Sequence, residues 1–227
     1  MSSIRENIQR IKGTLPANTA LIAISKAKPV EAIAEAYRAG QHAFGENRAM
    51  EMAVKRSQLP EDIQWHFVGH LQSNKVRYIV SFVHLIHSVD SERLLEVINN
   101  EGRKNKRVID CLLQFYIAQE ETKFGFTMEE VETMLQKRKF LQLKNIRLCG
   151  VMGMATLTDN SAQIQQEFQT LKQHFDYLKE KYFADESCFK EISMGMTDDY
   201  LIAVKEGSTM VRIGSAIFGE RDKPITD

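Results

Sequence analysis

Short apolar runs alternate with longer amphipathic segments along the chain. Eight runs have the length and composition of buried β-strands, and each is followed by a segment with helical periodicity or helix-capping residues. The runs cover residues 20–24, 42–44, 65–68, 84–87, 108–117, 146–152, 189–192 and 209–213. An amphipathic helix with Ile4, Ile8 and Ile11 on one face precedes them. Strands that alternate with helices predict parallel pairing through crossover connections.

Eight strand–helix units favour a single α/β domain, a (β/α)8 TIM barrel with an extra N-terminal helix and a short last helix. The alternative, a doubly wound open sheet, usually has a glycine-rich loop after its first strand. Here the first strand ends in Ser25-Lys26-Ala27-Lys28, which contains no glycine. No linker-like or low-complexity tract divides the sequence, so residues 1–227 are expected to form one domain.

Capping residues and apolar stripes locate several helices. Thr127 and Glu130 have the spacing of a capping box. Thr197 is expected to cap a helix that ends near Glu206. Further helices are expected over residues 46–56 and from residue 73. A long helix is expected from the stripe formed by Ile164, Phe168, Leu171, Phe175 and Leu178.

Charge and cysteine content narrow the functional classes. The 227 residues include 30 basic and 30 acidic side chains, a net charge of zero that argues against nucleic acid or an anionic membrane as the main partner. Three cysteines, an odd number set in or beside apolar runs, favour free thiols in a reducing cytoplasm. The N-terminus lacks the apolar core of a signal peptide. The alternation of strands and helices gives every apolar helix face a strand to pack against. Because no apolar face is left for a subunit interface, a monomer is favoured.

Lys26 is the sharpest chemical candidate, because barrel active sites lie at the carboxyl ends of the strands. Desolvation at the end of an apolar strand lowers a lysine pKa and makes the amine nucleophilic toward an aldehyde. Alternatively, the stem of Lys26 covers the barrel rim while its ammonium reaches solvent. Taken alone, the residue favours this second interpretation.

The loops after the seventh and eighth strands have the composition of a phosphate site. Ser193, Gly195 and Thr197 supply two hydroxyls and a flexible backbone, and Gly214 with Ser215 supplies another pair. Barrels commonly bind phosphate at these two loops. Ordinary turn and capping chemistry is the alternative for each loop alone. Together with a strand-end lysine, both loops favour a phosphorylated aldehyde as ligand.

Arg212 and two histidines complete the candidates. Strand alternation puts Arg212 on the same face as Gly214, where its charge needs either a carboxylate or a ligand ring nitrogen as partner. His66 and His70 are four residues apart but no carboxylate completes a zinc motif, so no metal site is expected. For at least one of these histidines, a hydrogen-bonding role in the site and a structural role are equally favoured.

Long motifs at these positions resemble the pyridoxal phosphate homeostasis protein family. They are Ile22-Ala23-Ile24-Ser25-Lys26-Ala27-Lys28-Pro29, Phe44-Gly45-Glu46-Asn47, and the segments 65–75, 192–199 and 207–219. The resemblance extends from residue 20 to residue 221. It implies the barrel of the alanine racemase N-terminal domain without that enzyme's second domain. It also implies pyridoxal 5′-phosphate (PLP), a form of vitamin B6, as cofactor.

By this resemblance Lys26 carries PLP as a Schiff base, and Arg212 faces the pyridine nitrogen. The same resemblance implies phosphate binding at Ser193, Gly214 and Ser215, with Thr197 and the Gly195 backbone nearby, and Lys123 as a second lysine that assists transfer. Asn47 and His66 are further cofactor-binding candidates because of their positions at the carboxyl ends of strands. Two segments depart from the family pattern. They are the aromatic Tyr116 in 114–117 and the stretch 153–156, which lacks the usual Ile-Pro ending.

The implied role is intracellular PLP homeostasis: a carrier or buffer that delivers cofactor to apo-enzymes with little or no turnover. A cationic Arg212 disfavours protonation of the pyridine nitrogen and so weakens the electron sink that PLP enzymes use. A PLP-dependent amino-acid racemase is the first alternative, although racemases of this fold take one base from a second domain. A cofactor-free phosphosugar enzyme that uses Lys26 as its Schiff-base former is the second.

Overall fold

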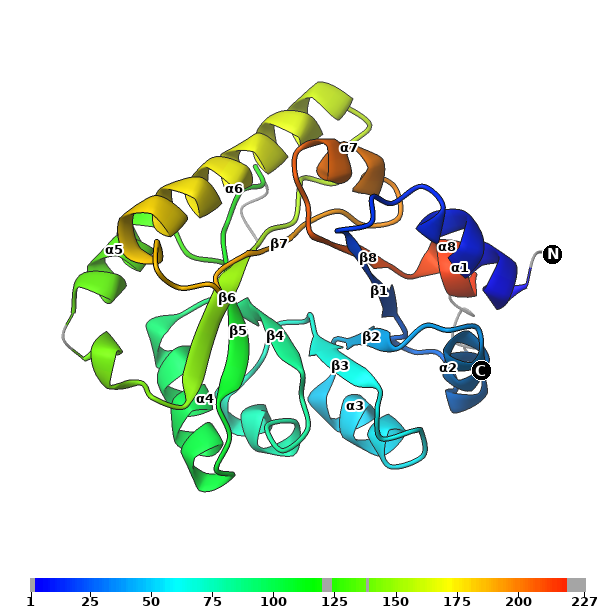
Figure 1. Ribbon diagram of the computed structural model, residues 1–227, viewed down its shortest axis with the longest axis horizontal. Coiled ribbons are helices and arrows are strands. Elements are labelled where there is room, and N and C mark those ends of the chain that lie inside the picture. The colour runs from blue at the N-terminus through cyan, green and yellow to red at the C-terminus, as the bar shows by residue number, and fades with distance from the viewer. Residues whose placement is uncertain (1–2, 120–123, 138, 220–227) are drawn as a thin grey trace, which may run out of the picture.

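The eight predicted strands form a closed parallel barrel in the computed structural model, which describes residues 3–119, 124–137 and 139–219 (Figure 1). Each strand pairs with the next, and the first pairs with the last, so that Ile22 lies beside Arg212. The predicted (β/α)8 barrel is therefore confirmed. The strands are β1 (Ala20–Ile24), β2 (Ala43–Glu46), β3 (Gln64–Phe67), β4 (Leu85–Val89), β5 (Ile109–Gln114), β6 (Ile146–Met152), β7 (Glu191–Ser193) and β8 (Met210–Ile213).

Helices surround the barrel on its outside (Figure 1). The extra helix α1 precedes β1 as predicted and packs beside α8, where Asn7 Nδ2 donates a hydrogen bond to the carbonyl of Ile217 (3.0 Å). The α-helices are α1 (Ile4–Lys12), α2 (Val30–Arg38), α3 (Ala49–Arg56), α4 (Glu92–Lys104), α5 (Met128–Gln136), α6 (Ser161–Tyr182), α7 (Tyr200–Lys205) and α8 (Ser215–Phe218). Two short 3-10 helices, η1 (Ser73–Tyr78) and η2 (Phe140–Gln142), complete the set.

The capping box before α5 is confirmed. Thr127 Oγ1 accepts the N–H of Glu130 (3.2 Å), and the Glu130 carboxylate accepts the N–H of Thr127 (2.8 Å). The stripe predicted for the long helix is also found on α6, where Phe168, Leu171 and Leu178 are fully buried.

Two predicted helix boundaries were wrong, and a third predicted helix begins where expected but has the 3-10 form. Residues 46–56 become helical only at Ala49, because Glu46 ends β2 with its carboxylate buried in a polar network. The helix expected from Thr197 begins at Tyr200 with Asp199 as its N-cap, and the Thr197 hydroxyl accepts a hydrogen bond from Ser215. The segment from residue 73 forms the 3-10 helix η1, whose N-cap makes no side-chain hydrogen bond.

The hydrophobic core has two layers. The larger layer lies between the strands and the surrounding helices and includes Phe44, Trp65 and Phe168. A smaller cluster contains Leu85, Leu112, Cys149 and Met152, which come from β4, β5 and β6 and face the barrel interior. Among the residues described here, no helix is long and apolar enough to cross a membrane.

A bulge in β6 determines which of its residues face the interior. Cys111 of β5 pairs with Leu148, but Leu112 pairs with Gly150, so Cys149 is an extra residue. Strict alternation would place Cys149 and Met152 on opposite faces, whereas both belong to the interior cluster. Gly150 permits the bulge: its φ is 149°, and a Cβ would lie 1.8 Å from the Glu191 carbonyl oxygen.

We expect Gly150→Ala to lower the free energy of unfolding by more than about 4 kcal/mol, because the new methyl group meets rigid backbone. The measurement is urea denaturation followed by circular dichroism. Gly40→Ala is the matched control: Gly40 also has a positive φ (85°), but nothing lies within 4 Å of the added methyl group. Gly40→Ala therefore measures backbone strain alone, which should lower the free energy of unfolding by about 1–3 kcal/mol. Equal losses for the two variants would contradict the steric argument.

Candidate functional site

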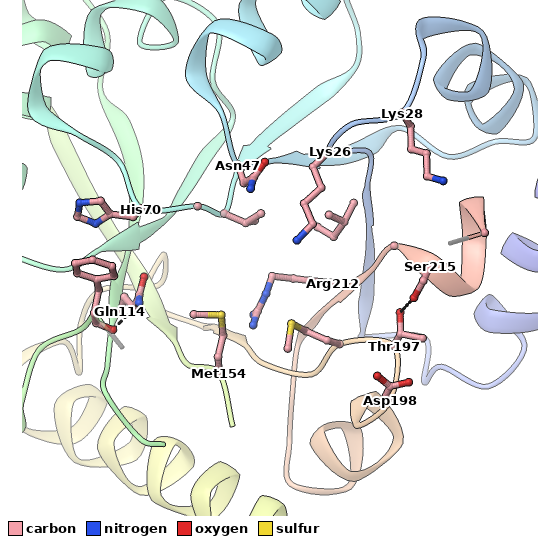
Figure 2. A pocket seen from close by; sticks show the side chains of 17 residues that line it. Lys26, Lys28, Asn47, His70, Gln114, Met154, Thr197, Asp198, Arg212 and Ser215 are labelled. Atoms are coloured by element: carbon pink, nitrogen blue, oxygen red, sulfur yellow. Dashed lines mark hydrogen bonds between the residues drawn. The ribbon is translucent and has the colours of Figure 1, made fainter. Parts of the chain in front are cut away.

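A cavity of about 420 Å³ opens at the carboxyl ends of the strands (Figure 2). Its volume lies within the usual range for sites that bind small molecules. β1 and β8 form neighbouring parts of its wall because the barrel closes between them. Seven residues proposed from the sequence line it: Lys26, Asn47, His70, Thr197, Arg212, Gly214 and Ser215.

Three other candidates lie elsewhere, and a fourth is not among the described residues. Ser193 and His66 are buried deeper in the barrel, and their side chains bond to other interior groups instead of lining the cavity. Gly195 contributes its carbonyl, which accepts the backbone N–H of Arg212 (2.9 Å). Its φ of 95° and the 2.6 Å distance from an added Cβ to Ala203 Cβ explain why glycine occupies this position. Lys123 lies outside the described residues.

Lys26 stands on a turn directly after β1, and its side chain points across the cavity toward Arg212 (Figure 2). The N–H of Lys28 donates to the carbonyl of Ser25 (3.0 Å) and closes the turn. Ala27 has a left-handed backbone (φ 58°), which is uncommon for a residue with a side chain. Its N–H donates to Glu51 Oε1 (2.8 Å), and this contact stabilises the strained turn.

A buried ion network supports the turn. Lys55 Nζ donates to the carbonyl of Ser25 (2.8 Å), to Glu46 Oε1 (2.7 Å) and to Glu51 Oε1 (2.6 Å). Ser25 Oγ also donates to Glu46 Oε1 (2.7 Å). Burial raises the pKa of Glu46, and the hydrogen bonds from Lys55 and Ser25 oppose that rise. The sequence analysis missed Lys55, whose only local signal is its i, i+4 spacing from Glu51.

Two hydroxyl groups meet on the β8 side of the cavity. Ser215 Oγ donates to Thr197 Oγ1 (3.1 Å; dashed line in Figure 2). Ser215 is the first residue of the four-residue helix α8, in which the N–H groups of Ile217 and Phe218 donate to the Gly214 carbonyl (2.9 and 3.0 Å). The N–H groups of Ser215 and Ala216 come before these bonds and have no acceptor within the helix. A Cβ on Gly214 would lie 3.3 Å from the Ile24 carbonyl oxygen, so only glycine fits there without displacement. Hydroxyls and free backbone N–H groups together are suited to bind a phosphate group.

Arg212 forms the floor of the cavity and is only 4% exposed. Its Nη1 donates to Ser193 Oγ (2.7 Å) and its Nη2 to the carbonyl of Gly153 (3.0 Å). Burial lowers the pKa of Arg212 to about 10, and the charge of Asp199 opposes this shift. The guanidinium is thus held by two neutral acceptors, with Asp199 acting through space. Gly153 belongs to one of the segments that depart from the family pattern.

The β5 side of the cavity has an aromatic wall. Gln114 Nε2 donates to the carbonyl of Phe124 (2.7 Å), and the Phe124 ring stacks on His70 with 4.1 Å between centroids. His70 Nδ1 lies 2.8 Å from Asp90 Oδ2. Of the two histidines considered from the sequence, His70 therefore lines the cavity and His66 does not. Phe124 was missed because an apolar side chain after a strand carries no chemical signature.

Two fully buried histidines lie beneath the cavity. His66 Nδ1 is 2.8 Å from His87 Nε2. Burial, with a smaller contribution from His84, lowers the pKa of His66 to about 3. Burial also lowers the pKa of His87 well below its usual value, and the neighbouring His66 and Arg212 add to the shift. Within the described ranges, no three His, Cys, Asp or Glu side chains are placed to hold a metal ion.

The sequence matches one family model and many curated relatives. The model is described as alanine racemase, N-terminal domain, and it matches residues 1–222. Proteins called pyridoxal phosphate homeostasis protein are 39% identical over 206 residues in Haemophilus influenzae and 37% identical over 243 residues in Vibrio alginolyticus. The first match covers 89% of this chain and 85% of the relative, and the second covers 98% and 99%.

Solved structures divide into near and distant neighbours. PipY of Synechococcus elongatus PCC7942, solved with PLP bound, is 35% identical with a TM-score of 0.87, and the match covers 96% of this chain and all of PipY. Alanine racemase from Streptomyces coelicolor A3(2) is 16% identical with a TM-score of 0.73. That match covers 95% of this chain but 57% of the racemase, and it shows a shared fold alone.

We expect Lys55→Met to lower the free energy of unfolding by about 3–5 kcal/mol, because Glu46 would keep a buried charge without its partner. Lys172→Met is the control: Lys172 pairs with Asp176 at the same i, i+4 spacing on the surface, where such a pair contributes less than about 1 kcal/mol. Urea denaturation at pH 7.5 measures both. Equal effects of the two variants would show that the buried network does not stabilise the turn.

The buried histidines predict a stability that falls with decreasing pH. In the unfolded chain a histidine binds a proton below about pH 6.5, whereas the folded protein resists protonation of His66 down to about pH 3. The contribution of His66 is therefore complete above pH 6.5 and decreases below it. Between pH 7.5 and 5, His66→Phe should reduce the pH slope of the unfolding free energy by up to about 1.4 kcal/mol per pH unit. An unchanged slope in His66→Phe would contradict the prediction.

Proposed function

The chain belongs to the pyridoxal phosphate homeostasis proteins, within the alanine racemase N-terminal domain family, and from this premise we propose that it binds PLP and holds it for delivery. The observation that carries the proposal is the convergence of Lys26, Arg212 and the Thr197–Ser215 hydroxyl pair on one cavity. A related protein of the same fold, PipY, has been solved with PLP bound.

The residues of the cavity fit the chemical groups of PLP. An amine, a pair of hydroxyls beside a helix N-terminus, and a buried arginine match an aldehyde, a phosphate and a ring nitrogen respectively. The glycine at position 214 allows β8 to lie close to Ile24 of β1, because an added Cβ would lie 3.3 Å from Ile24. Asn47 lines the same cavity and is available to the cofactor ring.

When bound, PLP supplies an aldehyde carbon that amines attack and a pyridine ring that can accept electron density. In this proposal Lys26 provides the amine that holds the aldehyde covalently. Thr197 and Ser215 bind the phosphate together with the first N–H groups of α8. Arg212 remains protonated beside the ring nitrogen, where its charge opposes a second positive charge on the ring.

Storage is the role that this arrangement favours over turnover. Most amino-acid chemistry on PLP draws on a protonated ring nitrogen, which a neighbouring guanidinium disfavours, and racemases of this fold compensate with two bases on opposite faces of the cofactor. Retention of a reactive aldehyde requires only a covalent link and a phosphate site. We propose apo forms of PLP-dependent enzymes as recipients, a monomeric carrier, and action in the cytoplasm. The free thiols of Cys111, Cys149 and Cys188 support a reducing compartment.

The test is an absorption spectrum of the purified protein with added PLP, before and after borohydride reduction, followed by peptide mapping. We expect a yellow band that borohydride removes and a pyridoxyl adduct on Lys26. Lys26→Ala should lose both. Lys28→Ala is the matched variant, since Lys28 lines the same cavity two residues away; it should retain the band and the adduct on Lys26.

Other outcomes would favour the alternatives. PLP-dependent loss of optical activity with a common amino acid, abolished in Lys26→Ala, would make the protein a racemase. Absence of a band at saturating PLP would remove the cofactor assignment and favour an enzyme that acts on a phosphosugar. An adduct on Lys28 in the wild-type protein would contradict the role given to Lys26.

A further inference from the structure

A continuous line of hydrogen-bonded side chains runs from the floor of the cavity into the barrel. Arg212 Nη1 donates to Ser193 Oγ, which lies 2.8 Å from His87 Nδ1. On its other side, His87 Nε2 lies 2.8 Å from His66 Nδ1. None of the four residues is more than 4% exposed. They come from β8, β7, β4 and β3, so the line crosses the barrel interior.

Arg212 fixes the direction of the first hydrogen bond in this line, because a guanidinium can only donate and Ser193 Oγ must accept. We assign the Ser193 proton to His87 Nδ1, because the hydroxyl is fully buried and this ring nitrogen lies within hydrogen-bonding distance (2.8 Å). A neutral imidazole that accepts at Nδ1 carries its proton on Nε2, so His87 donates to His66 Nδ1. His66 in turn carries its proton on Nε2. That nitrogen is buried and has no hydrogen-bond partner among the described residues.

The electrostatic surroundings keep both imidazoles neutral. Burial lowers the pKa of His66 and of His87, and the charge of Arg212 further opposes protonation of His87. A protonated His87 would donate from both ring nitrogens, and the Ser193 hydroxyl would then have to accept from two cationic groups. The Ser193 proton therefore has an acceptor only when His87 is neutral and carries its own proton on Nε2.

Stability does not account for this line of residues. It ends in a buried donor without an acceptor, which is destabilising, and apolar side chains fill barrel interiors without that penalty. What the line does provide is a single orientation of the Ser193 hydroxyl. That orientation leaves the Ser193 lone pairs free to accept from Arg212, and it ties the guanidinium to the cavity floor through Nη1.

We propose that His87 is a positioning residue for Arg212: it orients the Ser193 hydroxyl, which holds the guanidinium in place and so determines the electrostatic environment of a bound PLP ring. This inference rests on the proposed function and assigns a role to residues that do not line the cavity. Ser193, expected from the sequence to bind phosphate, acts in this proposal on Arg212.

His87→Phe, Ser193→Ala and His87→Gln test the proposal. His87→Phe removes the acceptor for the Ser193 proton, and Ser193→Ala removes the link itself. His87→Gln keeps one amide acceptor and one amide donor. The control is His84→Phe, because the exposed His84 lies beside His66 but outside the hydrogen-bonded line. Each protein is titrated with PLP, and both the dissociation constant and the absorption maximum of the bound form are measured.

We expect His87→Phe and Ser193→Ala to raise the PLP dissociation constant about tenfold, the effect of weakening one charge-assisted hydrogen bond. The absorption maximum should also move in both, because the ring senses a displaced guanidinium. His87→Gln should restore much of the affinity and the wild-type maximum. His84→Phe should match the wild type in both measurements. Borohydride should still attach the cofactor to Lys26 in every variant.

A purely structural role would lower the unfolding temperature of His87→Phe but leave the absorption maximum and dissociation constant of the folded protein unchanged. That result, or equal effects of His87→Phe and His84→Phe, would overturn the proposal. If His87→Phe does not fold, Ser193→Ala and His87→Gln decide the matter by the same two measurements. A wild-type protein that shows no band with PLP would instead overturn the proposed function.

Discussion

The pairing of β1 with β8 is the contact on which the candidate site depends. It sets Ile22 beside Arg212, and therefore brings the turn that carries Lys26 to the same rim as α8. Neither strand alone carries both an amine and a buried cation at its carboxyl end. Closure of the barrel also removes both sheet edges, so the parts of the site are fixed relative to one another by backbone hydrogen bonds.

Two buried polar networks lie under the two principal side chains of the cavity. Lys55 and Glu46 hold the turn beneath Lys26, while Ser193 and His87 lie beneath Arg212. Buried charges and imidazoles stabilise a fold poorly, because desolvation opposes their mutual attraction. The apolar layer between strands and helices supplies the stability that the barrel interior lacks. The layer between strands and helices thus stabilises the fold, while the polar groups inside the barrel position the side chains of the cavity.

The sequence predicted the fold well because the barrel rests on local signals. Apolar runs, capping boxes and helical stripes each act within a few residues, and eight repetitions of one unit leave few alternatives. The site was predicted less completely. Lys26 and Ser215 closely follow strands and Arg212 lies near the end of one, so all three could be found from their positions at the carboxyl ends of strands. Lys55 and His87 could not, because each takes its role from partners on other elements that only the closed barrel brings within hydrogen-bonding distance.

Closure between the first and last strands has a consequence for how the protein acquires a ligand during its synthesis. Lys26 precedes Arg212 by 212 − 26 = 186 residues. At ribosomal rates the two are made roughly 10 to 40 s apart. During that interval Lys26 has neither its guanidinium neighbour nor the hydroxyl pair completed by Ser215. A nascent chain therefore cannot trap a phosphorylated aldehyde in the cavity, and loading must await release of at least the eighth strand and α8 from the ribosome.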